Sequence, residues 1–249
     1  MKAVLAIMDI DKVRKIKGVV KMAVSAGFLK KIERWIIDEH SGEILYLPFQ
    51  TLGNPYKARV ILVGANPEPL LEVDASDSQI LSETLVDSAL FSDLFQDEIA
   101  EASREYKGSL HFASWVNENL REQVVLSSLN GLNLENENLK QLKKGKDPLY
   151  LRGFEIFKEV INEFEPEFLV IQGSAAYKLF LEQYKEQLID IEVDNISASV
   201  QTLENSGVIA KLPLKNGRNV NILVCRSMGA FGKEGKTFGE FKEKLTQLL

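Results

Sequence analysis

Residues 58–69 read ARVILVGANPEP, a run of apolar residues that ends in glycine, asparagine and proline. The apolar part is short, rich in Val, Ile and Leu, and continuous rather than alternating. This pattern is typical of a strand that is covered on both faces, as in a parallel sheet. The stretch therefore predicts a buried strand over 58–64 that leads into a polar loop.

Three further stretches share this pattern: QVVLSSL at 123–129, FLVIQG at 168–173 and VNILVCR at 220–226. Segments of helical period separate or follow them, at 149–164, 174–188 and 237–249. Strands that alternate with helices predict an α/β fold, here a three-layer α/β/α sandwich with a central, mainly parallel four-stranded sheet. Residues 190–215 are ambiguous and are compatible with an added strand or hairpin.

Charge is distributed unevenly along the chain. Residues 1–35 hold nine basic and three acidic side chains, whereas residues 68–105 hold eleven acids and one base, Arg104. Two interpretations stay open: solvated helical faces, or a basic arm for a polyanion together with a repelling acidic segment. We predict a basic, helical N-terminal extension over 1–36 and an α/β domain over 37–249.

Composition excludes several classes of protein. The formal net charge of −6 argues against general phosphate attraction over the whole surface. A single cysteine, Cys225, forms no internal disulfide, and no apolar run is long enough to cross a membrane, so we expect a cytoplasmic protein. With only His40 and His111 and no Cys-x-x-Cys pair, we expect no metal site.

Two motifs invite misinterpretation. GAFGKEGKT at 229–237 resembles a phosphate-binding loop, but Ala230 stands where that loop requires its first glycine. Cys225 and His111 are the residue types that form the nucleophile and base of a thiol hydrolase. A lone cysteine inside an apolar strand is more often a packing residue, and we favour that interpretation.

In an open parallel sheet, working residues gather just beyond the carboxyl ends of the strands. The segments that follow the four predicted strands are rich in Gly, Asn and Ser, and we expect them to converge on one edge. The candidate residues in them are Gly64, Ala65, Asn66, Pro67, Ser128, Asn130, Arg226, Ser227, Met228 and Gly229.

GANPEP at 64–69 resembles the first active-site motif of the uracil-DNA glycosylase superfamily. The most similar pattern is the Gly-x-Asn-Pro-Gly-Pro of its single-strand-selective and mismatch-specific branches. FLVIQGSAAYKLF at 168–180 resembles a second shared element, and the final strand, loop and helix stand where the family has its minor-groove loop. The resemblance covers about 45–249, so the α/β domain over 37–249 is expected to be glycosylase-like.

The resemblance implies a DNA glycosylase that hydrolyses the bond to a flipped uracil or modified pyrimidine, without metal or other cofactor. Asn66 would position the attacking water and Pro67 would fix the turn. Backbone N–H groups near Gly64 and Ala65 would contact the base, and either Ser128 or Asn130 would read its edge. The implied partner is single-stranded or locally flipped DNA, with no membrane and no obligate protein partner, in DNA repair or antiviral defence.

The chain also departs from the family pattern. The last motif usually begins His-Pro-Ser or Asn-Pro-Ser, and here it reads Cys225-Arg226-Ser227. Arg226 is a candidate to replace the missing histidine as a cation beside the leaving base, or else to bind phosphate. Met228 or Phe231 is a candidate wedge for the vacated stack, and Lys233 and Lys236 are candidate phosphate contacts.

Two other functions stay open. One is a relative that has lost the chemistry and only binds nucleic acid or a nucleotide, which the missing histidine favours. The other is a hydrolase of free nucleosides or nucleotides, which the acidic charge favours.

Overall fold

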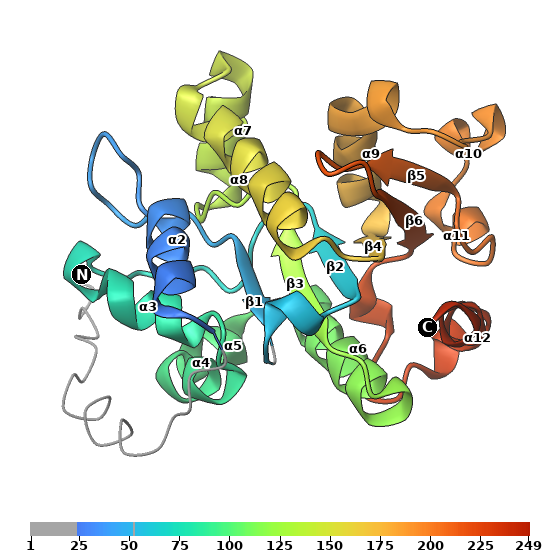
Figure 1. The fold of residues 1–249 in the computed structure, drawn as a ribbon, viewed down its shortest axis with the longest axis horizontal. Helices are drawn as coiled ribbons and strands as arrows, with labels where there is room; N and C mark the ends of the chain where they lie inside the picture. The colour runs from blue at the N-terminus through green and yellow to red at the C-terminus, as the bar shows by residue number, and fades with distance from the viewer. Residues whose placement is uncertain (1–23, 52) are drawn as a thin grey trace.

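The computed structural model describes residues 24–51 and 53–249, and it contains one six-stranded sheet (Figure 1). The strand order is β1-β3-β2-β4-β6-β5. The strands are β1 (Phe49–Thr51), β2 (Val60–Gly64), β3 (Val124–Ser128), β4 (Phe168–Gln172), β5 (Ala210–Pro213) and β6 (Asn219–Cys225).

The predicted α/β class is confirmed, but the predicted four-stranded sheet is wrong in its size. The four predicted strands are β2, β3, β4 and β6, and they pair in parallel. Two short strands extend the sheet antiparallel, β1 beside β3 and β5 beside β6, so the sheet is mixed. Strands of three and four residues are too short to produce a recognisable pattern. β5 lies within the ambiguous stretch 190–215.

Helices cover both faces of the sheet, which explains the continuous apolar runs. Along β2, Ile61 and Val63 join one core cluster, whereas Val60 and Leu62 join another. Successive side chains of a strand point to opposite faces, so the two clusters are the two sides of the sheet. The first side is covered by α2 (Ala26–Ile36), α8 (Pro148–Phe164) and α9 (Gly173–Tyr184). The second is covered by α6 (Arg104–Leu120) and α12 (Gly239–Leu248).

Shorter helices complete the described chain. The acid-rich segment forms α3 (Ser78–Thr84), α4 (Ser88–Leu94) and α5 (Gln96–Glu101), ahead of α6. The others are α7 (Asn136–Gly145), α10 (Val193–Ser197) and α11 (Val200–Leu203). Within the described part of the chain, every helix is too short or too polar to cross a bilayer.

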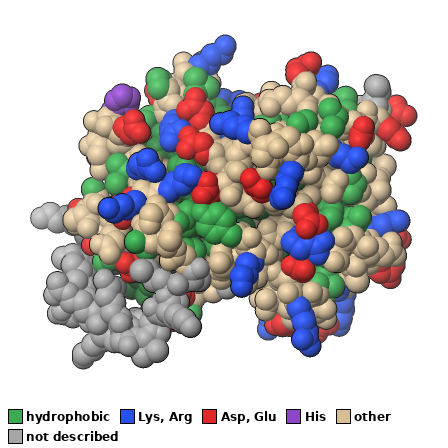
Figure 2. Space-filling model, viewed as in Figure 1, with side chains coloured by type: hydrophobic (Ala, Val, Ile, Leu, Met, Phe, Trp, Pro, Cys, Tyr) green, Lys and Arg blue, Asp and Glu red, His purple; other side chains and the backbone are tan. Residues whose placement is uncertain are grey.

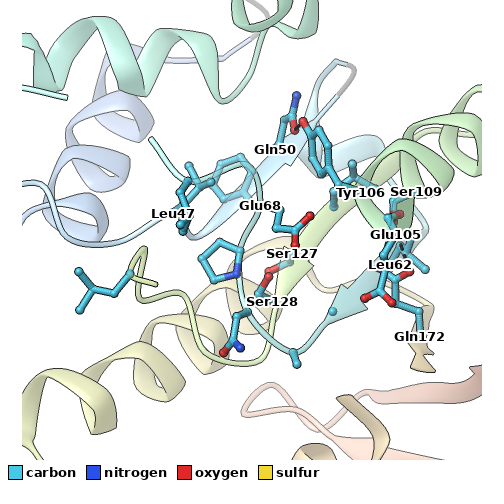
Figure 3. Close-up of a pocket in the computed structure, with 18 of the residues that line it drawn as sticks. Leu47, Gln50, Leu62, Glu68, Glu105, Tyr106, Ser109, Ser127, Ser128 and Gln172 are labelled. Atoms are coloured by element: carbon cyan, nitrogen blue, oxygen red, sulfur yellow. Dashed lines mark hydrogen bonds between the residues drawn. The ribbon is translucent and has the colours of Figure 1, made fainter. Parts of the chain in front are cut away.

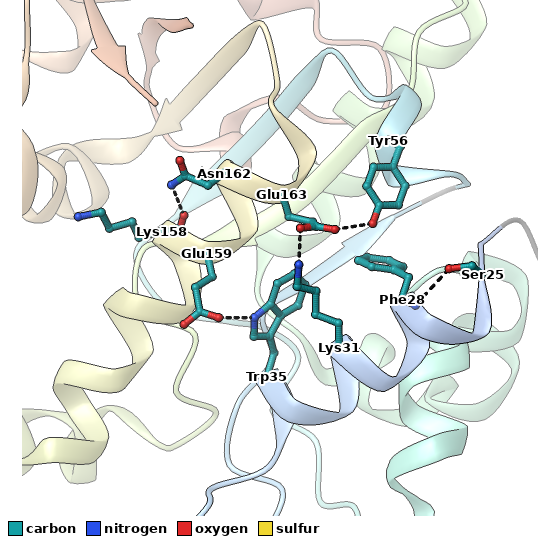
Figure 4. A network of polar contacts seen from close by, with 9 residues as sticks. All are labelled: Ser25, Phe28, Lys31, Trp35, Tyr56, Lys158, Glu159, Asn162 and Glu163. Atoms are coloured by element: carbon teal, nitrogen blue, oxygen red, sulfur yellow. Dashed lines mark hydrogen bonds and ion pairs between the residues drawn. The ribbon is translucent and has the colours of Figure 1, made fainter. Parts of the chain in front are cut away.

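A polar network fastens α2 to α8 (Figure 4). Glu163 of α8 pairs with the Lys31 ammonium and accepts a hydrogen bond of 2.6 Å from the Tyr56 hydroxyl. One turn earlier, Glu159 accepts a bond of 2.7 Å from the Trp35 indole N–H. α2 buries its apolar side in the first core cluster, so it packs as part of that core. Residues 1–23 of the predicted extension lie outside the described residues.

Candidate active site

The carboxyl ends of β2, β3 and β4 lie level with one another at one edge of the sheet. Gly64 is the register partner of Ser128, and Val63 is the partner of Ile171. The connection that leaves β2 ends in α6 on the second face, whereas those that leave β3 and β4 run through α8 and α9 on the first. The chain thus diverges to opposite faces beside β2, which is where open α/β sheets bind ligands.

A cavity of about 210 Å³ lies at this divergence (Figure 3). Its wall combines apolar side chains with amides, hydroxyls and carboxylates. The polar lining residues are Gln50, Asn66, Glu68, Glu105, Tyr106, Ser109, Ser127, Ser128, Asn136 and Gln172. Polar and apolar side chains therefore share the cavity wall, as they do in pockets that bind small molecules or nucleobases.

Two loops at the mouth of the cavity are fastened to each other. The carbonyl of Gly64 accepts a bond of 2.9 Å from the Leu129 N–H, and the carbonyl of Ala65 accepts one of 3.2 Å from the Asn130 N–H. Further out, the Asn133 side chain donates to the Leu71 carbonyl at 2.6 Å and accepts from its N–H at 3.3 Å. These bonds hold residues 65–71 against the loop that follows β3.

Five of the predicted site residues line this cavity: Gly64, Ala65, Asn66, Pro67 and Ser128. Among the residues that the structure describes, no group hydrogen-bonds to the side chain of Asn66 or of Ser128. Both groups are therefore available to a water molecule or a ligand.

Asn130 lies outside the cavity wall and has a different role from the one we considered. It is fully buried, its amide donates to the Tyr150 carbonyl at 2.9 Å, and its side-chain oxygen accepts from the Leu132 N–H at 3.0 Å. A Cβ at Gly153 would stand 2.0 Å from that oxygen, so α8 passes directly against it. Of the two alternatives for reading a base, only Ser128 faces the cavity.

Arg226 also lies away from the cavity, in contrast to the catalytic role predicted for it. Its guanidinium and backbone N–H bind the buried carboxylate of Glu204, at distances of 2.9 to 3.2 Å. It also donates to the Thr237 carbonyl and lies 4.7 Å from the centre of the Phe238 ring. These contacts hold the guanidinium of Arg226 outside the cavity wall, so it does not lie beside a base in the cavity.

The predicted wedge residues are buried. Met228 is 0% and Phe231 is 2% exposed, and the Phe231 ring packs against Phe112 at 5.6 Å between centroids. α6 crosses this segment so closely that a Cβ on Gly108 would stand 1.8 Å from the Met228 carbonyl oxygen. Neither side chain can enter a DNA stack from this position, which corrects that prediction.

Four other predicted residues, Ser227, Gly229, Lys233 and Lys236, lie outside the cavity wall. Gly229 donates its N–H to the Ser227 hydroxyl at 3.2 Å. Lys233 and Lys236 are exposed, and Lys236 pairs with Glu234 at 3.1 Å. Cys225 is fully buried, and burial raises the pKa of its thiol, so the cysteine fits the packing role we favoured.

Sequence reasoning missed two carboxylates of the cavity wall. Glu105, in the first turn of α6, accepts a hydrogen bond from the Ser227 hydroxyl on its Oε2. Glu68 accepts on its Oε2 from the hydroxyl and from the N–H of Ser103. Within residues 24–51 and 53–249, no donor reaches Oε1 of either carboxylate. An acid in the first turn of a helix is common, so nothing in the local pattern marked Glu105 as unusual.

Buried amides complete the wall on the side of α6. Gln172, the last residue of β4, donates to the Ser109 hydroxyl at 3.0 Å and accepts from the Met228 N–H at 3.3 Å. The Tyr106 hydroxyl donates to Gln50 at 2.6 Å. Burial raises the pKa of Tyr106, so this phenol stays neutral and acts as a donor. In Figure 3, Glu105, Ser109 and Gln172 lie together at one side of the cavity.

The described residues of the cavity wall carry negative charge and no positive charge. Of the described residues that form it, none is lysine, arginine or histidine, and two are glutamates. Over the described part of the face in Figure 2, basic and acidic side chains are interspersed. Among residues 24–51 and 53–249, no three His, Cys, Asp or Glu side chains are grouped to hold a metal ion.

Comparison of the chain with protein-family models and with curated proteins finds no match.

Proposed function

We propose that this chain is a DNA glycosylase, which hydrolyses the N-glycosidic bond of a nucleotide flipped out of DNA into the cavity. The observation that carries the proposal is the position of Asn66. Its amide stands just beyond the carboxyl end of β2 and lines a cavity with the hydroxyl of Ser128, and neither side chain has a hydrogen-bond partner among the described residues.

The residues of the wall suit the reaction. Cleavage of the bond leaves positive charge on the sugar, in an oxocarbenium-like transition state, and carboxylates fixed nearby stabilise such charge. The Asn66 amide can hold the attacking water by hydrogen bonds but cannot take its proton. Glu68 or Glu105 can, because no donor from the described part of the chain reaches Oε1 of either carboxylate.

Recognition of the base would fall to neutral polar groups. Ser128 presents a hydroxyl, and Asn136 lines the same wall with an amide. A flipped uracil or modified pyrimidine carries donors and acceptors along one edge, and such groups read it by direct hydrogen bonds. The reaction as proposed requires no cofactor, and the exposed Lys233 and Lys236 are candidates for contacts with DNA phosphates.

The proposal is tested by incubating the protein with end-labelled oligonucleotides that each carry one candidate base, in single- and double-stranded form. Alkali then cleaves at abasic sites. We expect cleavage by wild type and a loss of about 100-fold or more in Asn66→Ala, because the water loses its anchor. Asn138→Ala on α7 is the matched control, since Asn138 is exposed and does not line the cavity.

A second candidate is a protein that binds a flipped nucleotide without cleaving it. The observation that favours it is the engagement of Arg226 by Glu204, which leaves the cavity wall without a described cation for an anionic leaving group. It predicts salt-sensitive binding of the oligonucleotides, no abasic sites with any base, and binding that survives Asn66→Ala.

A further inference from the structure

The charge of the cavity wall bears on which base can leave from it. A neutral base such as uracil departs with an extra electron pair, and a cation or strong donor must stabilise its negative charge. Here Arg226 is held by Glu204, Thr237 and Phe238, and the wall contains Glu68 and Glu105 instead. Two carboxylates raise the energy of an anionic leaving group, so the wall is poorly suited to a neutral base.

A base that already carries a positive charge reverses this argument. A nucleobase alkylated on a ring nitrogen that carries no hydrogen, such as N7 of guanine or N3 of cytosine, is cationic while it is attached to the sugar and becomes neutral when it departs. Its positive charge is attracted by the two carboxylates when the base enters the cavity. No anion then forms, so no histidine or arginine is required.

From these two arguments we infer that the substrate class is DNA with a cationic, ring-N-alkylated base, which enters the cavity facing Glu68 and Glu105. The inference rests on the proposed glycosylase function and specifies its substrate. It replaces uracil, which leaves as an anion, with a base that is cationic when bound and neutral when it leaves.

The reaction balances without any co-reactant except water. The bond between C1′ and the base nitrogen breaks, and its electron pair neutralises the cationic base. The oxygen of the water held by Asn66 bonds to C1′, and one proton of that water passes to Oε1 of Glu105 and then to solvent. The products are an abasic deoxyribose, the neutral alkylated base and one proton.

Glu105 is the more firmly positioned of the two carboxylates. The Ser227 hydroxyl holds one of its oxygens, and Gln172 and Ser109 are fixed beside it by their own bond of 3.0 Å (Figure 3). Glu68 lies on an exposed loop position, and Ser103 is its one hydrogen-bond partner among the residues that the structure describes.

The test compares oligonucleotides that carry 7-methylguanine or 3-methylcytosine with others that carry uracil or hypoxanthine. Released base is measured by chromatography, and each rate is divided by the spontaneous rate for the same base, because cationic bases also leave faster unaided. We expect this acceleration to be about 10- to 100-fold greater for the cationic bases.

Three variants assign the effect to the wall. We expect Glu105→Gln to lower the acceleration for cationic bases about 10-fold or more while changing that for neutral bases less. Glu68→Gln should act in the same direction, and its exposed position keeps it testable if Glu105→Gln does not fold. Glu101→Gln, on the exposed surface of α5, should match wild type.

The outcomes separate the two proposals. Equal or greater acceleration for uracil or hypoxanthine would overturn the substrate inference and leave the glycosylase standing. Cationic bases released equally well by wild type and by both Gln variants would also overturn it. If wild type releases no base at all, the glycosylase proposal fails, and the substrate inference fails with it.

Discussion

The hydroxyl of Ser227 donates a hydrogen bond to the carboxylate of Glu105, a residue 122 positions earlier in the chain. Ser227 follows the last strand of the sheet, and Glu105 lines the cavity from the first turn of α6. We had expected Ser227 to bind substrate directly, but instead it positions Glu105, which lines the cavity.

This bond predicts the effect of Ser227→Ala on catalysis. Loss of a hydrogen bond to a charged group costs about 1.5–3 kcal/mol, so we expect the maximal rate of base release to fall about 10- to 100-fold. The Michaelis constant should change little, because Ser227 does not line the cavity. Single-turnover kinetics measure the effect, and Ser227→Thr, which keeps the hydroxyl, should restore most of the rate. Equal loss in both variants would contradict a positioning role.

Ser128 and Asn130 should separate function from stability. Asn130→Ala leaves the Tyr150 carbonyl and the Leu132 N–H unpaired in the core, so we expect unfolding to become easier by about 3 kcal/mol. Ser128→Ala removes a hydroxyl without a described partner and should leave stability within about 0.5 kcal/mol while weakening base release. Urea unfolding followed by circular dichroism compares the two. An Asn130→Ala protein with the unfolding free energy of wild type would contradict the structural role of Asn130.

Substitution by alanine should have different effects on stability at two glycines. At Gly108 a Cβ would stand 1.8 Å from the Met228 carbonyl oxygen, so Gly108→Ala forces α6 away from the loop beneath it. We expect a loss of at least about 2 kcal/mol. At Gly145, in the last turn of α7, a Cβ meets nothing within 4 Å, and alanine should be neutral or stabilise by up to about 1 kcal/mol. Thermal unfolding of both variants checks the contrast.

The bond network of Glu163 predicts a pH-dependent stability. Burial opposes the charged form, but the Lys31 ammonium and the Tyr56 hydroxyl outweigh it, and together they lower the pKa of Glu163 below the ordinary glutamate value. A lowered folded-state pKa contributes stability above the unfolded-state value, and this contribution is lost as the pH falls through the folded-state value. Wild type should therefore exceed Glu163→Gln in unfolding free energy at pH 7, and the difference should shrink toward pH 3.

Urea titrations at several pH values measure that difference. Glu155→Gln, a more exposed carboxylate of the same helix, is the control and should differ little from wild type across the range. A difference between wild type and Glu163→Gln that stays constant down to pH 3 would contradict the assignment.

The sequence by itself determined the four parallel strands at the centre of the sheet and a part of the cavity wall. Continuous apolar runs at β2, β3, β4 and β6 reflect burial on both faces, a property that each strand records in its own residues. Since parallel strands end at a common edge, the loop 64–67 and Ser128 could be placed together before any coordinates. The edge strands β1 and β5 could not, because three or four residues carry too little pattern.

Only the tertiary structure decided what the polar residues do. Asn130 and Arg226 follow strands, as residues of an active site often do. Their side chains instead bind Tyr150 and Glu204. Glu105 looks like an ordinary first-turn acid until Ser227 is brought against it. Apolar periodicity reports burial locally, whereas the role of a polar side chain depends on the partner it meets, and that partner is set by how distant segments pack.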